Sequence, residues 1–547
     1  MQPIQRREWC FPLALAIAFA VVGSLPYLQA IRAEGPDETF MGFVGRGTPG
    51  ANSYFAFSRQ VAEGGMLTTN LYNPHAPSRA YFNPEWWIIG ATARATGLSL
   101  TTLFHGERVL AAFAFLLAAY YLCAVVLATA RHRRLALALV AFGGGFGWIV
   151  EALNAVIHGN LVVPADTQGV TLFAYLVNKP HFIRAGACAA LQYAWLIRGA
   201  ESGRWGFFCA AGLAASAHSL IRPYQIPEAC LVLLLHVVAR SFQDPRATRT
   251  AMLQAGCAIL GHAPAIAWHA WILMDNPLGL GPMQAWQPML LLMQTLWLGL
   301  PFCAVLVYAG LRCARGHWSP APSIPVLWLA AAMLLLQAHP WFPWGVESYF
   351  PWVLAPPLLF VKHIVPPAEN WLKARLRTRF LRPLTLALLM VLILPGNALN
   401  YARFFTALHE PVPPWRYYLP DDLLNGLNWL ETEAAPESVI LASHDTSQFV
   451  PRLADLRVVS GQDVLTDRYR EANASVLRFF LTPGDDAFKV GFCREQRVSY
   501  VVIGPFERAV AALNPADHRW MRPVYNEGNI AIYRVELDRS QGPADRE

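Results

Sequence analysis

The stretch EGPDETFMGFVGRGTPGANSYFAFSRQVAEGGMLTTNLYNPHAPSRAYFNPEWW covers residues 34–87 and, after Ile88 and Ile89, continues as GATARATGLSLTTLFHGE to Glu107. It carries charged, Tyr, Trp and Asn side chains, whereas the runs on either side of it are apolar. A chain that is mostly apolar enough to lie in lipid, and that keeps a long aromatic-rich loop on one face, is expected to use that face. We therefore interpret residues 34–106 as an outer loop that covers an active site.

The composition indicates the class of protein. Of the 547 residues, 55% are hydrophobic and only 14% are charged, whereas a soluble domain carries about a quarter charged residues. This deficit indicates an integral membrane protein. The net charge of +7 does not indicate a nucleic-acid partner, because the basic residues lie between hydrophobic runs and form no solvated patch. The nine cysteines include no C-x-x-C pair and predict neither a disulfide framework nor a zinc site.

The apolar runs predict about eleven membrane spans, because one span needs about 20 mostly apolar residues. The candidate spans are residues 9–31, 107–130, 135–157, 180–198, 205–221, 224–240, 251–273, 289–311, 323–338, 346–364 and 383–401. We predict that the first span is not cleaved, because its apolar region exceeds the roughly 7–15 residues of a signal-peptide core.

Basic residues between the spans predict the orientation, since cytoplasmic loops are rich in Lys and Arg. If the N-terminus is cytoplasmic, clusters such as 131–134 and 362–382 fall inside, and residues 34–106 fall outside. We expect a multi-pass protein of the cell (inner) membrane. Its transmembrane domain, residues 1–401, includes the first outer loop, and residues 402–547 form a soluble extracytoplasmic domain.

Residues 402–547 change from long apolar runs to short ones. The strand-like runs are 438–442, 456–460, 498–504 and 529–535, and helical patterns cover 422–434, 467–481 and 485–496. Alternation of buried strands with helices predicts a small α/β domain with a largely parallel sheet. No G-x-G-x-x-G pattern follows its first strand, so we predict no nucleotide site there.

Several motifs along the chain resemble one family. They include NSYFAFSRQVAEGG (52–65), LYNPHAPSRAYFNPEWWIIG (71–90), LFAYLVNKPHFI (172–183) and HSLIRPYQIP (218–227). With many spans, an acidic first outer loop and an outer tail, the chain resembles the GT-C class of integral-membrane glycosyltransferases. Relatives in that class include the protein O-mannosyltransferases and the lipid A aminoarabinose transferases. The resemblance is to a bacterial multispan group of mostly unassigned substrate.

The resemblance implies transfer of a sugar from a polyprenyl-phosphate carrier to a lipid, glycan or protein on the outer face. It also implies a catalytic Asp or Glu in the first outer loop. The sequence departs from similar chains at two places. Pro49 and Gly50 stand where acidic residues are often found, and the late outer segment 339–350 has no Arg.

The transfer needs a base for the acceptor and a counter-charge for the departing phosphate. Asp37 and Glu38 lie a few residues beyond the first span and are the candidate catalytic carboxylates, together with Glu347 at the outer start of the tenth span. A positioned carboxylate contributes about 10²–10⁴-fold in rate. The alternative is that Asp37 and Glu38 end a span or lie solvated in the loop.

Basic residues near the outer face are the candidate phosphate ligands: Arg222, Lys179, His181 and Arg184. Arg suits phosphate because its fork can donate to two oxygens. The alternative for Arg222 is that its side chain extends to the membrane interface, which is common at span ends. Asp166 lies in the second outer loop and either lines the same cavity or caps the following segment.

Two further substrate-binding candidates, Tyr72 and Asn83, flank the amphipathic stretch PEWWIIGATARATG, which we predict to be a helix along the outer surface. His218 and His262 lie within apolar runs, where a lone His is more often an interhelical hydrogen-bond partner than a ligand.

Three functions remain at this stage. The first is a lipid-phosphate-sugar-dependent, inverting glycosyltransferase. The second is a non-catalytic protein of the same architecture that binds a lipid-linked glycan or partner proteins. The third, a transporter, is disfavoured because we find no inverted repeat and no acidic residue deep in a span. The expected partners are the donor, the acceptor and membrane lipids, and a divalent cation is left open.

Overall fold

The structure is a computed structural model that describes residues 4–45, 48–77, 79–143, 147–157, 172–275, 310, 319–338, 349–375, 394–409, 417–510 and 512–537. Its contacts divide the chain into two compact units, which we describe separately. The helical unit comprises Met1–Leu28, Phe104–Ala270 and Gln284–Ala407. The sheet unit comprises Gln29–Leu103, Trp271–Met283 and Leu408–Glu547.

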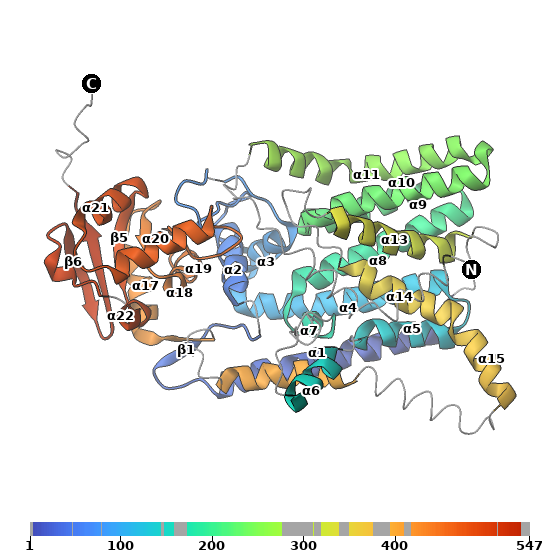
Figure 1. Cartoon of the computed structure of the whole chain (residues 1–547), viewed down its shortest axis with the longest axis horizontal. Helices are drawn as coiled ribbons and strands as arrows, with labels where there is room; N and C mark the ends of the chain where they lie inside the picture. Colours follow the sequence, from blue (N-terminus) through green and yellow to red (C-terminus); the bar gives the residue numbers. More distant parts are fainter. Residues whose placement is uncertain are drawn as a thin grey trace. The chain divides into compact units, whose positions relative to one another are not determined.

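The helical unit is built from long helices, several of which run alongside one another (Figure 1). The helices that lie wholly or mostly in it are η1 (Arg6–Trp9), α1 (Cys10–Arg32), α4 (Leu100–Val126), α5 (Ala130–Phe142), α6 (Gly147–Ile157), α7 (Leu172–Asn178), α8 (Pro180–Ser202), α9 (Trp205–Ile221), η3 (Pro223–Gln225), α10 (Ile226–Gln243), η4 (Pro245–Ala247), α11 (Thr248–Asp275), α13 (Pro320–Ala338), α14 (Phe350–His363) and α15 (Val365–Arg375).

Helices long and apolar enough to cross a membrane are present among the described residues. They are Arg6–Arg32, Leu100–Val126, Pro223–Gln243 and Pro245–Ile272, and the shorter Trp205–Ile221 and Ser323–Leu335 are also apolar. The architecture is therefore mostly helical, with several candidate membrane helices. The count of about eleven spans stays a prediction, because predicted spans such as 289–311 lie outside the described residues.

Glycines allow close packing between helices of this unit. A Cβ on Gly212 of α9 would lie 2.2 Å from the carbonyl oxygen of Ala258 on α11, and one on Gly186 of α8 would lie 2.5 Å from the ring of Phe350. Without a side chain at these positions, the backbones approach closely, as small residues permit in membrane bundles.

The sheet unit combines the first outer loop with the C-terminal region. Its elements are β1 (Glu38–Phe40), α2 (Thr48–Ala62), α3 (Pro84–Thr96), η6 (Ala407–His409), β2 (Tyr418–Pro420), α17 (Asp421–Glu433), β3 (Val439–Leu441), α18 (His444–Ser447), α19 (Val450–Leu453), β4 (Arg457–Val458), α20 (Tyr469–Leu481), α21 (Asp486–Glu495), β5 (Val498–Ile503), α22 (Pro505–Val510), η8 (Pro515–Asp517), β6 (Met521–Glu527) and β7 (Ile530–Val535).

The five-stranded sheet has the order β4-β3-β5-β7-β6. Strands β4, β3 and β5 are parallel, as the sequence predicts, whereas β7 pairs antiparallel with both β5 and β6. The prediction of a largely parallel sheet is therefore wrong for its second half. The reason is local, because β6 and β7 are joined by a turn at Gly528 (φ +56°) that is too short for a parallel crossover.

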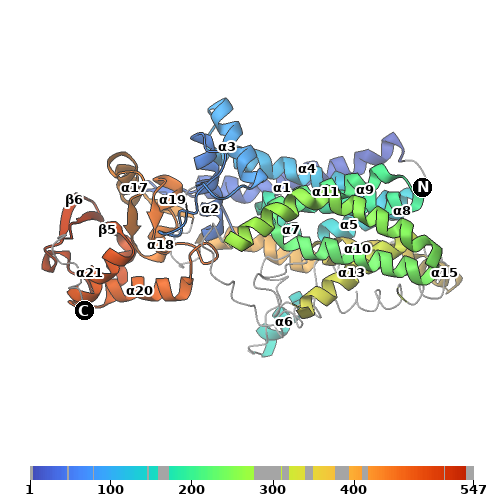
Figure 2. The same cartoon turned by 90° about the horizontal axis from the view of Figure 1, so that it is seen from above.

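Both faces of the sheet are buried by helices. Ile440 and Val502 share a core with Leu427 of α17, and Leu441 and Val501 share another with residues of α20 and α21. Figure 2 shows α17 and α21 on opposite sides of β5. The three predicted helices of this region match α17, α20 and α21. The result is a three-layer α/β/α arrangement.

The first outer loop belongs to this core. Strand β1 pairs antiparallel with β2, and Met41, Ala56 and Tyr72 lie in the same apolar cluster as β3 and β5. The sequence-based division instead placed residues 34–106 with the transmembrane domain. Hydropathy reports only local composition. It therefore cannot show that two three-residue strands far apart in the sequence, β1 and β2, pair with each other.

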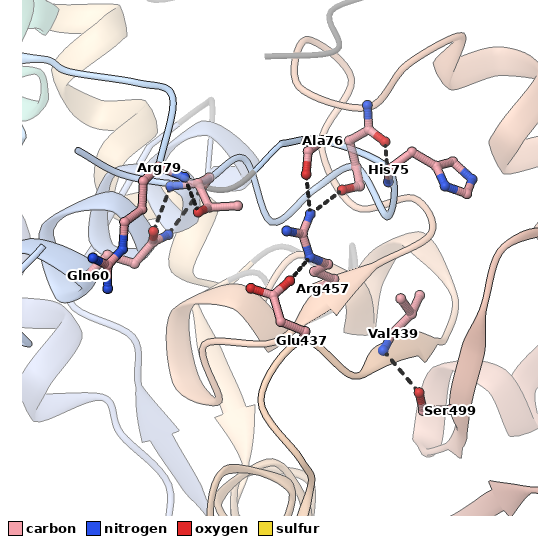
Figure 3. Close-up of polar contacts among 10 residues, drawn as sticks. Gln60, His75, Ala76, Arg79, Glu437, Val439, Arg457 and Ser499 are labelled. Carbon is pink, nitrogen blue, oxygen red and sulfur yellow. Dashed lines mark hydrogen bonds and ion pairs between the residues drawn. The ribbon is translucent and has the colours of Figure 1, made fainter. Parts of the chain in front are cut away.

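A buried arginine holds the second half of the loop on strand β4 (Figure 3). Arg457 donates to the carbonyl oxygens of Ala76 (2.8 Å) and Asn73 (3.2 Å), and its Nε donates to Glu437 at 2.6 Å. Arg457 thus satisfies backbone acceptors in a segment that has no regular structure of its own, and it keeps residues 73–76 in one conformation.

Candidate active site

Two cations of the helical unit stand at helix breaks made by proline. Lys179 separates α7 from α8, which begins at Pro180, and Arg222 separates α9 from η3, which begins at Pro223. Neither residue is helical (φ −127°, ψ 82° at Lys179 and φ −139°, ψ 97° at Arg222), because a following proline disfavours helical geometry. The sequence therefore places a basic side chain at each of two interruptions in the helical bundle.

The structure brings these two cations to the same aromatic ring. The Arg222 guanidinium carbon lies 3.5 Å from the centroid of the Phe182 ring, and Lys179 Nζ lies 5.1 Å from it. Arg222 is buried, with 2% of its surface exposed. A cation over a ring face gains about 0.5–2 kcal/mol, the higher value applying when it is desolvated. The cationic groups of Lys179 and Arg222 therefore lie against the same ring, that of Phe182.

Aromatic side chains enclose the same region. The Tyr175 ring lies 4.6 Å from Phe182 and 5.0 Å from Tyr349, measured between centroids, and Lys179 Nζ lies 5.2 Å from Tyr175. His181, on the first turn of α8, has its ring 4.9 Å from that of Phe182. These rings come from α7, α8 and the start of α14.

Arg184 has a different setting from Lys179 and Arg222. It forms an ion pair with Glu107 of α4, a carboxylate that is itself buried. Sequence reasoning missed this role for Glu107, although an acid within an apolar run is costly unless it has a partner. Because Glu107 balances its charge, Arg184 adds little net positive charge to the cluster.

The cluster has the chemistry of an anion site. It contains two cationic side chains, its walls are aromatic, and Lys179 and His181 stand at the N-terminus of the 23-residue helix α8, where backbone N–H groups and the helix dipole favour negative charge. Arg adds a planar fork suited to phosphate. Of the predicted phosphate ligands, the structure brings together Lys179, His181 and Arg222.

The predicted interhelical role of the buried histidines is confirmed for His262. Its Nε2 lies 2.9 Å from the Ser219 hydroxyl, and His269 Nε2 bonds the carbonyl oxygen of Ser219 at 2.9 Å. These contacts join α9 to α11 and explain both residues as polar links between apolar helices.

The two predicted carboxylates of the first loop belong to the sheet unit. Glu38 lies in β1 opposite Pro420, and its Oε1 accepts from the Gly35 N–H at 3.3 Å. Asp37 has an exposed side chain, while its carbonyl oxygen accepts from the Asp421 N–H at 3.0 Å. The strand therefore fixes the backbone of both residues and leaves the Asp37 carboxylate in solvent.

Tyr72 and Asn83 have contacts within the sheet unit that account for their residue types. The fully buried Tyr72 hydroxyl donates to the carbonyl oxygen of Gln448 at 3.1 Å, and burial raises its pKa. The Asn83 side chain caps α3 by accepting from the Glu85 N–H at 3.0 Å. Their predicted substrate contacts stay predictions.

Two predicted site residues, Asp166 and Glu347, lie outside the described residues. Within the part of the chain that the structure describes, no group of three or more His, Cys, Asp or Glu side chains could hold a metal ion. The divalent cation stays open.

No protein-family model matches the sequence, and no curated protein matches it significantly. Several solved structures resemble it over nearly its whole length. ArnT from Cupriavidus metallidurans, bound to undecaprenyl phosphate, matches with a TM-score of 0.51 at 13% identity, over 97% of this chain and 99% of ArnT. The arabinofuranosyltransferase AftD from mycobacteria matches with a TM-score of 0.54 at 15% identity, over 98% of this chain and 42% of AftD. The chain has the GT-C fold. The predicted resemblance is thereby confirmed as to fold, and any role for the residues of this GT-C chain has to come from its own chemistry.

Proposed function

We propose that the protein is a membrane glycosyltransferase that transfers a sugar from a polyprenyl-phosphate carrier to a lipid, glycan or protein acceptor on the outer face of the membrane. The observation that carries the proposal is the pair of cations, Lys179 and Arg222, held against the Phe182 ring. ArnT, which has the same fold, was solved with undecaprenyl phosphate, and AftD is an arabinofuranosyltransferase.

In the proposed complex Arg222 donates two hydrogen bonds to the carrier phosphate, and Lys179 supplies a second positive charge. The phosphate gains negative charge as the sugar leaves it. Cations fixed in position before the reaction stabilise that charge without reorganisation, and this kind of stabilisation is usually the largest single contribution to catalysis. The aromatic rings around the cluster keep water away and strengthen the interaction.

The reaction is a displacement at the anomeric carbon. An acceptor hydroxyl oxygen forms the new bond to that carbon, and the bond to the phosphate oxygen breaks with its electron pair on the carrier. Attack from the opposite side inverts the anomeric centre. The acceptor proton passes to a carboxylate, for which we propose Asp37 or Glu38.

The test uses membranes that contain the full-length protein and are supplied with radiolabelled polyprenyl-phosphate hexoses or pentoses. We expect label to move into a lipid, glycan or protein fraction, and we expect Arg222→Ala and the double variant Asp37→Ala/Glu38→Ala to lose this transfer. If the double variant transferred label at the rate of the wild-type protein, neither carboxylate could be the base.

The second candidate is a protein of the same fold that binds the carrier and does no chemistry. The residues that favour it are Pro49 and Gly50, which occupy places where an acid is often found in similar sequences. Tight binding of undecaprenyl phosphate by the wild-type protein, with no transfer from any labelled donor, would select this function.

A further inference from the structure

Two cysteines of the helical unit face each other across the contact between α9 and α11. The thiol of Cys257 on α11 forms a weak hydrogen bond with the thiol of Cys209 on α9. Both thiols are free, Cys209 is exposed, and Cys257 is partly exposed. A cysteine that only fills an apolar core is enclosed by its neighbours, whereas this pair is open on one side. The pair therefore has a chemistry that packing alone does not require.

Glycines bring the backbones of α9 and α11 together about one turn from the cysteines. A Cβ on Gly212 of α9 would lie 2.2 Å from the Ala258 carbonyl oxygen and 2.9 Å from Gly261 Cα. A Cβ on Gly261 would lie 2.9 Å from the Cys209 carbonyl oxygen. The backbone of Cys209 thus contacts α11 at a residue that is four positions after Cys257 and lies on the same face of that helix.

Contacts further along the two helices keep the same register. The Ala265 N–H donates to the Ser216 hydroxyl at 3.2 Å, and His269 Nε2 bonds the Ser219 carbonyl oxygen at 2.9 Å. The partners are 49 positions apart in the first contact and 50 in the second, close to the separation of the two cysteines. A nearly constant separation means that α9 and α11 run parallel. The thiol contact therefore belongs to an extended interface and does not depend on one side-chain rotamer.

This geometry is suited to a disulfide. A disulfide needs Cα atoms about 4.4–6.8 Å apart and Cβ atoms that point toward each other. The close approach of the two backbones beside Cys209 favours the first condition, and the contact between the thiols meets the second.

We propose that Cys209 and Cys257 are a redox modification site, at which an oxidant of the peroxide class joins them in a disulfide between α9 and α11. One sulfur attacks a peroxide oxygen, the O–O bond breaks, and one water leaves as a sulfenic acid forms. The second sulfur displaces the sulfenic hydroxyl as a second water, and the S–S bond forms. The two thiols lose two electrons and two protons, and hydrogen peroxide is reduced to two molecules of water.

The disulfide would hold the part of α9 that the serine contacts do not. Cys209 lies near the start of α9, whereas Ser216 and Ser219 lie in its last turns, shortly before Arg222. With the disulfide formed, α9 is tied to α11 at both ends. The modification needs no sugar transfer and is measured without it.

Oxidation of the full-length protein in nanodiscs tests the proposal. The protein is treated with hydrogen peroxide, the remaining thiols are alkylated with N-ethylmaleimide under denaturing conditions, and disulfide-linked peptides are quantified by mass spectrometry. We expect the 209–257 link to be about tenfold more abundant than a link between any other two cysteines and to disappear on reduction with dithiothreitol. Cys209→Ser should remove the link.

A pair of glycine variants tests the geometric cause. Gly212→Ala places a methyl group against the Ala258 carbonyl oxygen, forces the helices apart and should lower the yield of the link about fivefold. Gly206→Ala, on the same helix, is the matched control, because a Cβ there meets no described atom within 4 Å, and its yield should equal that of the wild type. The Tm of each variant shows whether it is folded.

Three results would overturn the proposal. The first is no 209–257 link in the wild-type protein under conditions that oxidise the exposed Cys10, and this result counts even if Gly212→Ala does not fold. The second is a link between Cys209 residues of two chains in place of the 209–257 link. The third is a folded Gly212→Ala protein that forms the link as efficiently as Gly206→Ala.

Discussion

Replacement of Arg222 is the perturbation that tests the candidate site most directly. Arg222→Ala removes a buried guanidinium that lies 3.5 Å over the Phe182 ring. If the guanidinium donates two bonds to the carrier phosphate, each contributes about 1.5–3 kcal/mol as a hydrogen bond to a charged group. Lys179 remains on the same ring and offsets part of the loss.

The net loss is therefore expected to be about 3 kcal/mol, which is roughly a 100-fold increase in the Kd for undecaprenyl phosphate. Arg222→Lys keeps the charge but loses the planar fork, so its Kd should rise only about tenfold. The Kd should therefore increase in the order wild type, Arg222→Lys, Arg222→Ala if the planar fork binds the phosphate. If the contact were purely electrostatic, Arg222→Lys would bind as tightly as the wild type.

The assay is binding of undecaprenyl phosphate to the purified full-length protein, measured by native mass spectrometry, with Tm as the check on folding. Arg198 is the matched control, because its guanidinium lies 4.6 Å over Phe207 and donates to the Tyr121 hydroxyl at 2.7 Å. Arg198→Ala should change the Kd less than about threefold. The reasoning is refuted if folded Arg222→Ala binds like the wild type, or if Arg198→Ala weakens binding as much.

Three further outcomes are expected. Asp37→Asn or Glu38→Gln should lower transfer about 10²–10⁴-fold at whichever residue is the base, measured as label transfer in membranes; unchanged rates in both variants would exclude them. Tyr72→Phe should destabilise the sheet unit by about 1 kcal/mol, because it removes a buried hydrogen bond, and an unchanged melting curve would contradict this. Burial, with the neighbouring Glu63 carboxylate, raises the pKa of Asp455 from 3.8 to about 7. The folded state therefore keeps a proton that the unfolded state loses near pH 4, so this stability is present below about pH 4 and is lost as the pH rises to 7. Between pH 4 and pH 7 the Tm of Asp455→Asn should therefore fall less than the Tm of the wild type. An equal fall in Tm for both proteins would refute the assignment to Asp455.

Local features of the chain could be predicted from the sequence. The helix PEWWIIGATARATG is found as α3, and the strands at 438–442, 456–460 and 498–504 contain β3, β4 and β5. These elements follow from short-range periodicity and composition, which act within about ten to twenty residues. The non-helical backbones of the residues before Pro180 and Pro223 also have a local cause, because a following proline disfavours helical geometry.

Contacts between distant segments could not be predicted in the same way. The Arg184–Glu107 ion pair joins α8 to α4, and no periodicity in either helix indicates the partner. Strand β6 was missed because Pro523 is unusual in a strand; the structure has it on the edge strand, beside an irregularity in the β6–β7 register, where proline is tolerated. The joining of the first loop to the C-terminal region was missed for the same reason, since pairing partners are set by tertiary packing.

The shared core of the sheet unit also constrains how the protein is made. Thr39 is synthesised early and bonds Asp421, which follows it by 382 positions. Until the ribosome delivers the last quarter of the chain, Met41 and Tyr72 have no strands to pack against. This apolar loop surface therefore stays exposed during most of translation, and a prematurely terminated chain would expose it permanently, which favours aggregation.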